Sequence, residues 1–278
     1  LHTLELRQAH TWSRGKGASV TVIDTGADVN HPDLQSQIHE HHDFAAQGHG
    51  EFSADAHGTA IAGVIAAASD NGVGMAGVAP EAELHVLRAC WYVSDRSRAV
   101  CNSFALAKAL THALESGTQV INLSLGGPHD ALLGRLVELA LDRDIVVIAA
   151  APAGTSSGFP ADVAGVIVVA SEPSDAAPAA PRLVAPGKEI LVPTPGGGFD
   201  YASGTSLSAA HVSGVVALLL AQAPQIDRDQ IQKLLVESRE ADDMSVNACR
   251  ALANLTNQTG CRSDAVPGAA LVQQSESD

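Results

Sequence analysis

The sequence predicts an α/β domain in which helices pack on a mainly parallel sheet. Short apolar runs that are typical of buried strands alternate with longer runs of helical periodicity. Of the 278 residues, 46% are hydrophobic but only 3% are aromatic, so small and aliphatic side chains must fill the core. Such a core suits helices laid on strands, and one large domain accounts for this length better than several small ones.

The predicted elements follow one another in βαβ order. Strands are expected at 20–23, 84–87, 120–123, 145–149 and 166–169, and helices between them at 60–68, 104–114 and 132–141. A buried helix over 212–220 and an amphipathic surface helix over 230–236 follow. Residues 172–181 predict a surface loop. The polar sequence after Cys261 predicts a flexible tail at 263–278, behind a single domain at 1–262.

The charge balance excludes several classes of partner. The chain has 16 Lys and Arg against 31 Asp and Glu, a formal net charge of −15, which argues against nucleic acid or an anionic membrane. No run approaches the roughly 18 apolar residues that a membrane span needs. The first residues do not have the pattern of a signal peptide, so we expect that any targeting segment has been removed or lies outside this sequence.

The four cysteines form two close pairs in the sequence, Cys90 with Cys101 and Cys249 with Cys261. This spacing favours two local disulfides over a metal site, and disulfides persist in an oxidising compartment. We therefore expect a secreted or periplasmic protein. The alternative is four reduced, partly buried thiols in a cytosolic protein.

Three residues stand in contexts that suit nucleophilic catalysis. Asp24 follows a buried strand in VTVIDTG, where its carboxylate can orient an imidazole. His57 opens an Ala-rich helix in HGTAIAGVIAA, and the adjacent Gly58 allows close approach of another segment. Ser206 lies at a turn entering a helix in SGTSLSAAHVSG, where backbone N–H groups point at a developing oxyanion. Taken singly, the Asp could bind a metal or a ribose, and the His and Ser could be helix caps.

In the order Asp24, His57, Ser206, these motifs resemble the active-site signatures of the subtilisin-like serine peptidases. The resemblance covers roughly residues 4–255 and extends to GVAPEAELHVLRA, VINLSLGG, FPADVAGVIVVAS and VAPGKEI. It implies a doubly wound, mainly parallel sheet with helices on both faces. It also implies a serine endopeptidase in which Ser206 attacks the peptide carbonyl, His57 transfers the proton and Asp24 holds His57.

The resemblance further implies how substrate binds. Ser124, Leu125 and Gly126 match the family's substrate-binding strand, which pairs with an extended peptide through backbone hydrogen bonds. The segment beginning at Ser94 corresponds to the opposing strand. Peptides or proteins are the expected substrates, a propeptide or inhibitor is a possible partner, and no cofactor is needed for the chemistry. A monomer is expected.

The oxyanion site departs from the family pattern. The family has a Gly-Asn pair whose Asn side chain donates to the oxyanion, but this chain has Pro152 and Ala153 there. Loss of that donor costs about 100- to 1000-fold in turnover, a value known from subtilisin itself. The expected donors are therefore the Ser206 backbone N–H and the Thr205 hydroxyl, with residues 155–157 leaving room for a substitute.

Two rival functions compete with the peptidase. A pseudopeptidase that binds extended peptides or a protein partner without turnover is motivated by Ala153, but the intact triad argues against it. An esterase or lipase of another fold is excluded, because Ser206 does not lie in a G-x-S-x-G motif and the residue order differs.

A structural calcium site is implied by the resemblance. The family commonly holds calcium with an Asp in the HPDL motif, here Asp33, and with the loop that contains Asp70 and Asn71. The alternative is that Asp33 caps a turn beneath this loop.

Other polar clusters favour simpler interpretations. The run of His39, His41, His42 and Asp43, with His49 nearby, could chelate a transition metal, but a solvated loop is expected. Arg96 and Arg98 could favour acidic substrate side chains, but they too are expected on a solvated face.

Overall fold

The computed structural model describes residues 4–45, 50–93, 99–152, 158–171, 182–240 and 244–261. Its centre is a seven-stranded sheet with the order β2-β3-β1-β6-β7-β8-β9. The strands are β1 (Ser19–Asp24), β2 (Ile38–Asp43), β3 (Glu83–Arg88), β6 (Val120–Leu123), β7 (Val146–Ala150), β8 (Ile167–Ala170) and β9 (Leu183–Val184). Neighbouring strands of this sheet all pair in parallel, which confirms the predicted parallel sheet.

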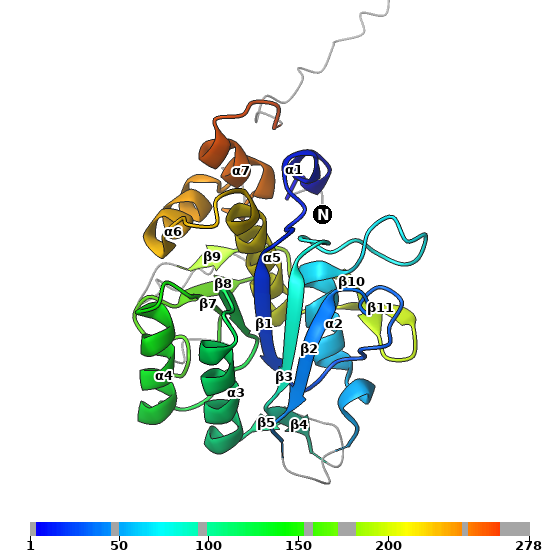
Figure 1. Ribbon diagram of the computed structural model, residues 1–278, viewed down its shortest axis with the longest axis vertical. Coiled ribbons are helices and arrows are strands. Elements are labelled where there is room, and N and C mark those ends of the chain that lie inside the picture. The colour runs from blue at the N-terminus through cyan, green and yellow to red at the C-terminus, as the bar shows by residue number, and fades with distance from the viewer. Residues whose placement is uncertain are drawn as a thin grey trace, which may run out of the picture.

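Helices cover both faces of the sheet, so the fold is doubly wound as predicted. Helices α3 (Ser103–Glu115) and α4 (Ala131–Leu141) lie in front in Figure 1, and α2 (Ala56–Ala66) and α5 (Thr205–Gln222) lie behind. Helices α1 (Leu6–Trp12), α6 (Arg228–Glu237) and α7 (Ala248–Thr256) gather at the end of the molecule opposite the small hairpin β4 (Cys90–Tyr92) and β5 (Ala99–Cys101). A short 3₁₀ turn (Phe52–Ala54) precedes α2, and β10 (Ile190–Thr194) pairs with β11 (Gly198–Ala202).

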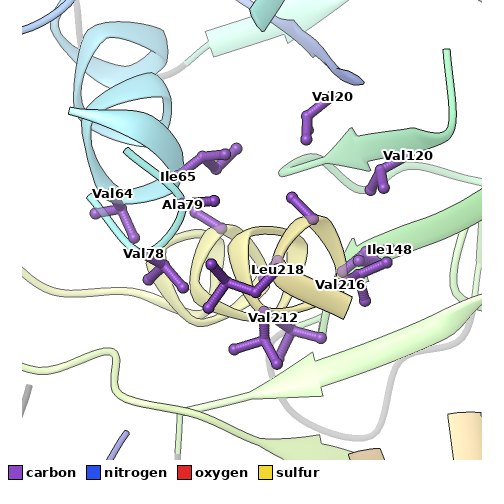
Figure 2. Packing of buried hydrophobic residues seen from close by; sticks show 14 of the residues in the cluster. Val20, Val64, Ile65, Val78, Ala79, Val120, Ile148, Val212, Val216 and Leu218 are labelled. Atoms are coloured by element: carbon purple, nitrogen blue, oxygen red, sulfur yellow. The ribbon is translucent and has the colours of Figure 1, made fainter. Parts of the chain in front are cut away.

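The larger core cluster is built around α5. Val212, Val216 and Leu218 of this helix are fully buried, and they pack between α2 and the sheet (Figure 2). Within the described residues, α5 is the one helix whose length and composition would suit a membrane span, yet 78% of it is buried inside the protein. It is therefore a core helix of the protein.

The strand order reverses direction at β1. From β1 the chain builds β2 and β3 on one side, then crosses to β6 and its neighbours on the other. In such sheets a crevice opens beyond the carboxyl ends of the two strands that flank the reversal. Asp24 ends β1 and Ser124 directly follows β6, so the fold brings these two residues to that crevice.

The predicted strands and helices are all present, most with boundaries shifted by a few residues, but the helix predicted over 212–220 already begins at Thr205. One expectation was wrong: residues 39–43 form most of edge strand β2 instead of a solvated loop. The polar composition of this run concealed the strand, because an edge strand with exposed side chains lacks the apolar signal of a buried one. The predicted loop at 172–181 and tail at 263–278 lie outside the described residues.

Candidate functional site

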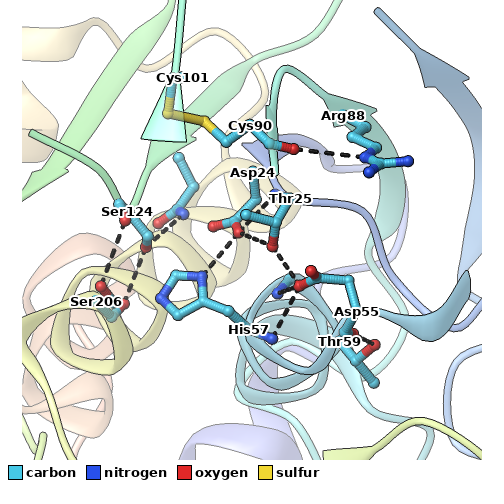
Figure 3. A network of polar contacts seen from close by, with 12 residues as sticks. Asp24, Thr25, Asp55, His57, Thr59, Arg88, Cys90, Cys101, Ser124 and Ser206 are labelled. Atoms are coloured by element: carbon cyan, nitrogen blue, oxygen red, sulfur yellow. Dashed lines mark hydrogen bonds and ion pairs between the residues drawn. A yellow bond between two sulfur atoms is a disulfide. The ribbon is translucent and has the colours of Figure 1, made fainter. Parts of the chain in front are cut away.

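Asp24 and His57 form a hydrogen-bonded pair at the crevice. Asp24 is 3% exposed, and its Oδ1 lies 2.7 Å from His57 Nδ1 (Figure 3). The same oxygen accepts hydrogen bonds from the Thr25 backbone N–H at 2.7 Å and the Thr25 hydroxyl at 2.9 Å. Because a carboxylate can only accept, His57 carries its proton on Nδ1, and Nε2 is left to take a proton from a nucleophile.

Asp55 fixes the start of the helix that carries His57. Its side chain caps α2 by accepting from the backbone N–H of His57 at 3.0 Å and of Gly58 at 3.2 Å. It also hydrogen-bonds the Thr25 hydroxyl, which links it to Asp24 (Figure 3). A Cβ atom at Gly58 would lie 1.8 Å from the carbonyl oxygen of Gly26, so the predicted close approach at this glycine is confirmed.

The two carboxylates change the proton affinity of the imidazole. The charge of Asp24 is the main cause that raises the pKa of His57 to about 9, against the opposing effect of burial; the hydrogen bond that His57 donates to Asp24 and the charge of Asp55 add to the rise. Burial is the main cause that raises the pKa of Asp55, and the neighbouring charge of Asp24 adds to it. The pair of carboxylates therefore stabilises the protonated form of His57.

Ser206 is the second residue of α5 and lies beside Ser124. Its hydroxyl donates to the Ser124 carbonyl at 3.4 Å, while the Ser124 hydroxyl donates to the Ser206 carbonyl at 3.1 Å (Figure 3). Among the hydrogen bonds of the described residues, none joins Ser206 to His57. Such catalytic contacts often tighten only when substrate binds. The predicted triad residues thus border two neighbouring hollows, with Asp24 and His57 in one and Ser206 in the other.

A buried polar network lies behind Ser206, and no motif of the sequence predicted it. Asn122 of β6 is fully buried and donates to the Ser124 hydroxyl at 2.9 Å. Ser213 of α5, also fully buried, donates to Asn122 Oδ1 at 3.0 Å. The signal in the sequence was a lone Asn within the apolar run VINL, since a buried amide requires partners.

The start of α5 offers one clear donor for an oxyanion. As the second helical residue, Ser206 has an N–H with no intrahelical acceptor, and the positive end of the helix dipole adds to it. The Thr205 hydroxyl donates to the Ala151 carbonyl at 3.0 Å, which anchors the helix to the end of β7. Ala153 and residues 155–157 lie outside the described residues.

Two hollows flank the segment of Ser124, Leu125 and Gly126. One has a volume of about 530 Å³ and is bordered by Ser206, Thr205 and Phe159. The other, about 660 Å³, lies between this segment and the β4–β5 hairpin and includes Asp24 and His57. The predicted substrate-binding segment therefore forms the wall between them. Ser94, Arg96 and Arg98 lie outside the described residues.

Both predicted cysteine pairs are disulfides in the structure. Cys90 is bonded to Cys101 across the β4–β5 hairpin, with Cα atoms 4.1 Å apart (Figure 3). Cys249 of α7 is bonded to Cys261, with Cα atoms 5.8 Å apart. Only the first of these bridges borders a hollow of the site.

Asp33 and Asn71, the two residues of the calcium hypothesis, contact each other through the side-chain N–H of Asn71. Asp33 is fully buried, and its two carboxylate oxygens accept from Asn71 Nδ2 at 2.8 Å and from the Met75 N–H at 3.1 Å. Asn71 Oδ1 accepts from the Val73 N–H at 3.1 Å. Asp70 instead pairs with Arg14 at 2.9 Å. Within the described part of the chain, no ion pair neutralises Asp33, and its two oxygens accept from N–H groups of the loop above it.

Known proteins match the chain over most of its length. A model of the subtilase family matches residues 15–260. The thermophilic serine proteinase of Bacillus sp. (strain AK1) is 35% identical over 249 residues, 85% of this chain and 60% of that protein. The major intracellular serine protease of Bacillus subtilis (strain 168) is 34% identical over 244 residues, 81% of this chain and 74% of that protein.

The fold is also found among solved structures. Fervidolysin from Fervidobacterium pennivorans, described as a keratinolytic enzyme related to subtilisin, aligns with a TM-score of 0.76 at 29% identity. The alignment covers 91% of this chain and 45% of the fervidolysin chain. The chain therefore spans less than two thirds of fervidolysin, as it does of the proteinase from strain AK1.

Proposed function

The chain belongs to the subtilase family, and from this membership we propose that it is a serine endopeptidase acting through an acyl-enzyme. The observation that carries the proposal is the 2.7 Å contact between Asp24 and His57, in a hollow next to the one that Ser206 borders. An oriented imidazole beside a serine at a helix start is the arrangement that converts a hydroxyl into a nucleophile.

The reaction follows from these three residues. The Ser206 oxygen attacks the carbonyl carbon of the scissile bond, while its proton passes to His57 Nε2. The C–N bond then breaks, and the departing amine takes that proton, which leaves the acyl group on Ser206. Water repeats the sequence with the same proton transfers and releases the acid. Asp24 stays ionised throughout and stabilises the imidazolium formed in each half.

The hydrogen-bond donors available to the oxyanion determine the expected rate of turnover. We assign the Ser206 backbone N–H as the principal donor, supported by its place in the first turn of α5. Ala153 provides no side-chain donor, and the Thr205 hydroxyl must leave the Ala151 carbonyl before it can contribute. The proposed enzyme is therefore slow by comparison with relatives that have the Asn. A pseudopeptidase is the competing function, because the same missing donor motivates it.

The neutral hollow beside Ser206 favours an apolar substrate side chain. Its described walls contain glycine, alanine, proline, leucine, phenylalanine and hydroxyl residues, and no ionisable side chain. A charged substrate residue would lose hydration there without gaining a partner. We therefore propose cleavage after apolar residues, and a peptide library with one varied position tests this: preferential cleavage after Lys or Glu contradicts it.

We propose that calcium binds at Asp33 and the loop containing Asn71. The buried, unneutralised carboxylate of Asp33 supports this, and a reversed Asn71 amide would present its oxygen. The test is the melting temperature in calcium and in a chelator. Calcium should raise it in the wild type but not in Asp33→Asn, with Asn71→Ala as a second variant should the first not fold. An equal rise in the variants contradicts the site.

We propose an oxidising location, secreted or periplasmic, and a single peptidase domain at 1–262. The two disulfides support the location. Family membership alone does not decide it, because one relative is named an intracellular protease. Thiol titration of protein purified without reductant tests it: no free thiols are expected, and four reactive thiols would contradict it.

Covalent labelling tests the function itself. A fluorophosphonate should label wild-type protein at neutral pH and leave Ser206→Ala unlabelled, because only an activated serine attacks phosphorus. Labelling without peptide turnover would support the pseudopeptidase. Absence of labelling in a folded wild-type protein would contradict an activated Ser206.

A further inference from the structure

A cluster of metal-ligating side chains lies apart from the proposed active site, between edge strand β2 and helix α3. Glu40 Oε1 is 2.8 Å from His42 Nε2 and 2.9 Å from His112 Nε2. These three atoms all lie within 4.8 Å of one another, and the two imidazole rings have centroids 4.4 Å apart. The Glu40 carboxylate thus brings together β2 and His112 of α3, which are more than 60 positions apart in the sequence.

The chemistry of this cluster is that of a zinc site. Zn²⁺ is bound by imidazole nitrogen at about 2.0–2.1 Å and by carboxylate oxygen at similar distances, so neighbouring ligand atoms lie about 3 to 3.4 Å apart. The two short contacts of Glu40 need to lengthen only slightly to admit the ion. We propose that Glu40, His42 and His112 bind Zn²⁺, with water completing the coordination sphere.

The surroundings hold the ligands in place. His85 of β3 is the cross-strand partner of Glu40, and its Nδ1 lies 3.6 Å from Glu40 Oε2. That nitrogen is buried and has no hydrogen-bond partner among the described residues. It can therefore donate to Oε2 and leave Oε1 for the metal, which is the usual arrangement behind a ligand.

An aromatic ring supports both imidazoles from the side. The ring centroid of Phe44 lies 5.9 Å from that of His42 and 5.7 Å from that of His112. Phe44 thus lies next to both imidazole rings, whose Nε2 atoms contact Glu40.

Side chains alternate between the two faces of β2, so its three histidines do not all lie at this cluster. His41 packs near Phe52, with ring centroids 5.3 Å apart, and His39 faces Glu83 at 3.6 Å. Only His42 of this run points at Glu40 and His112. His49 lies outside the described residues. The sequence favoured a solvated loop for this run of histidines, with metal binding as the alternative, whereas the structure places one of them beside Glu40 and a histidine of α3.

A zinc ion there would join β2 to α3. Helix α3 begins two residues after Cys101 of the β4–β5 hairpin, which borders the crevice. The ion would stabilise the folded chain by its binding free energy without touching Asp24, His57 or Ser206. Its test is therefore independent of peptide hydrolysis.

Isothermal titration of the full chain with ZnCl₂ after chelator treatment tests the site. Ser206→Ala serves as a parallel background without self-cleavage. One Zn²⁺ per chain is expected, with a zinc-dependent rise in melting temperature. Co²⁺ should give the visible absorption of a protein-bound, low-coordinate ion. His42→Gln and His112→Gln keep a donor toward Glu40 but lose a ligand, so each should weaken Zn²⁺ binding at least tenfold.

His39→Gln is the matched control, because it removes an exposed histidine of the same strand and should bind Zn²⁺ as the wild type does. His42 is 45% exposed, so His42→Gln provides the decisive variant even if His112→Gln does not fold. The proposal is overturned by an absence of saturable binding, or by equal affinities of His42→Gln and His39→Gln.

Discussion

Ser124 and Ser206 hydrogen-bond each other twice, with the hydroxyl of each donating to the carbonyl of the other at 3.1 Å and 3.4 Å. The end of β6, which forms the predicted substrate-binding segment, is thereby fixed to the helix start that carries the nucleophile. A substrate that pairs with the backbone near Ser124 is therefore held in a fixed position relative to Ser206. The position of Ser206 depends on the polar network behind Ser124.

Ser213→Ala tests that network. The change removes a fully buried hydroxyl and leaves Asn122 Oδ1 without this donor, so the free energy of unfolding should fall by about 1–3 kcal/mol. Urea unfolding in the Ser206→Ala background measures it. Ser36→Ala removes a surface hydroxyl that bonds only the side chain of its neighbour among the described residues, and it should stay within about 0.5 kcal/mol of its parent. Equal effects of the two changes would show that the network contributes nothing.

Asp55→Asn should shift the pH dependence of kcat/KM. The neutral form of His57 acts as the base, and its pKa is raised to about 9, so activity should increase with pH up to that region. Asparagine keeps the cap acceptor but removes a negative charge that raises the pKa of His57. The acid limb of the profile should therefore move to lower pH.

Asp227→Asn is the matched control for that experiment. Asp227 caps α6 through the same kind of contact, accepting from the Gln230 N–H at 2.7 Å, and it is not part of the crevice. Its profile should coincide with that of the wild type. If the two variants gave the same profile, Asp55 would have no electrostatic effect on His57.

His211 should make the protein sensitive to acid. It is 1% exposed within α5, and burial is the main cause that lowers its pKa to about 4. In the unfolded chain it binds a proton below about pH 6.5. Stability from this group is complete above pH 6.5 and is lost as the pH falls toward 4, by about 3 kcal/mol in total. Unfolding in urea across this range measures it, and His211→Gln should reduce the slope. An unchanged slope would exclude His211 as the cause.

Removal of either disulfide should lower stability by a similar amount, but only one removal should affect substrate binding. They close loops of nearly equal length, with sequence separations of 11 and 12, so removal of either should cost about 2–4 kcal/mol. Only the Cys90–Cys101 bridge borders the crevice. Replacement of both its cysteines by serine should raise KM for a peptide substrate, whereas replacement of Cys249 and Cys261 should leave KM unchanged. Equal changes in KM would contradict a role of the hairpin in binding.

Much of the fold could be predicted because its buried elements have strong patterns. The strands that end at Asp24 and before Ser124 are almost wholly buried and rich in Val, Ile and Leu, and α5 combines an apolar stretch with a distinctive turn at Ser206. Parallel pairing then brings their carboxyl ends together. These signals are local, so a single sequence is enough to read them.

The remaining features depend on contacts that no local pattern records. Strand β2 is recognised only by its pairing with β3. His42 becomes a candidate metal ligand only because His112 of α3 contacts the same carboxylate. The role of Asp55 depends on the position of Thr25, 30 residues away. Asn122 and Ser213 meet across 91 residues. Such distant pairings are created by packing.

Hydrolysis of a generic peptide ester and the matching amide, by wild type beside Ser206→Ala, tests the central claim most directly. The wild type should turn over both substrates, and the ester faster, because its better leaving group depends less on the depleted oxyanion site. Ser206→Ala should be slower by several orders of magnitude on both. Equal rates for wild type and Ser206→Ala, in protein shown to be folded, would contradict a nucleophilic Ser206.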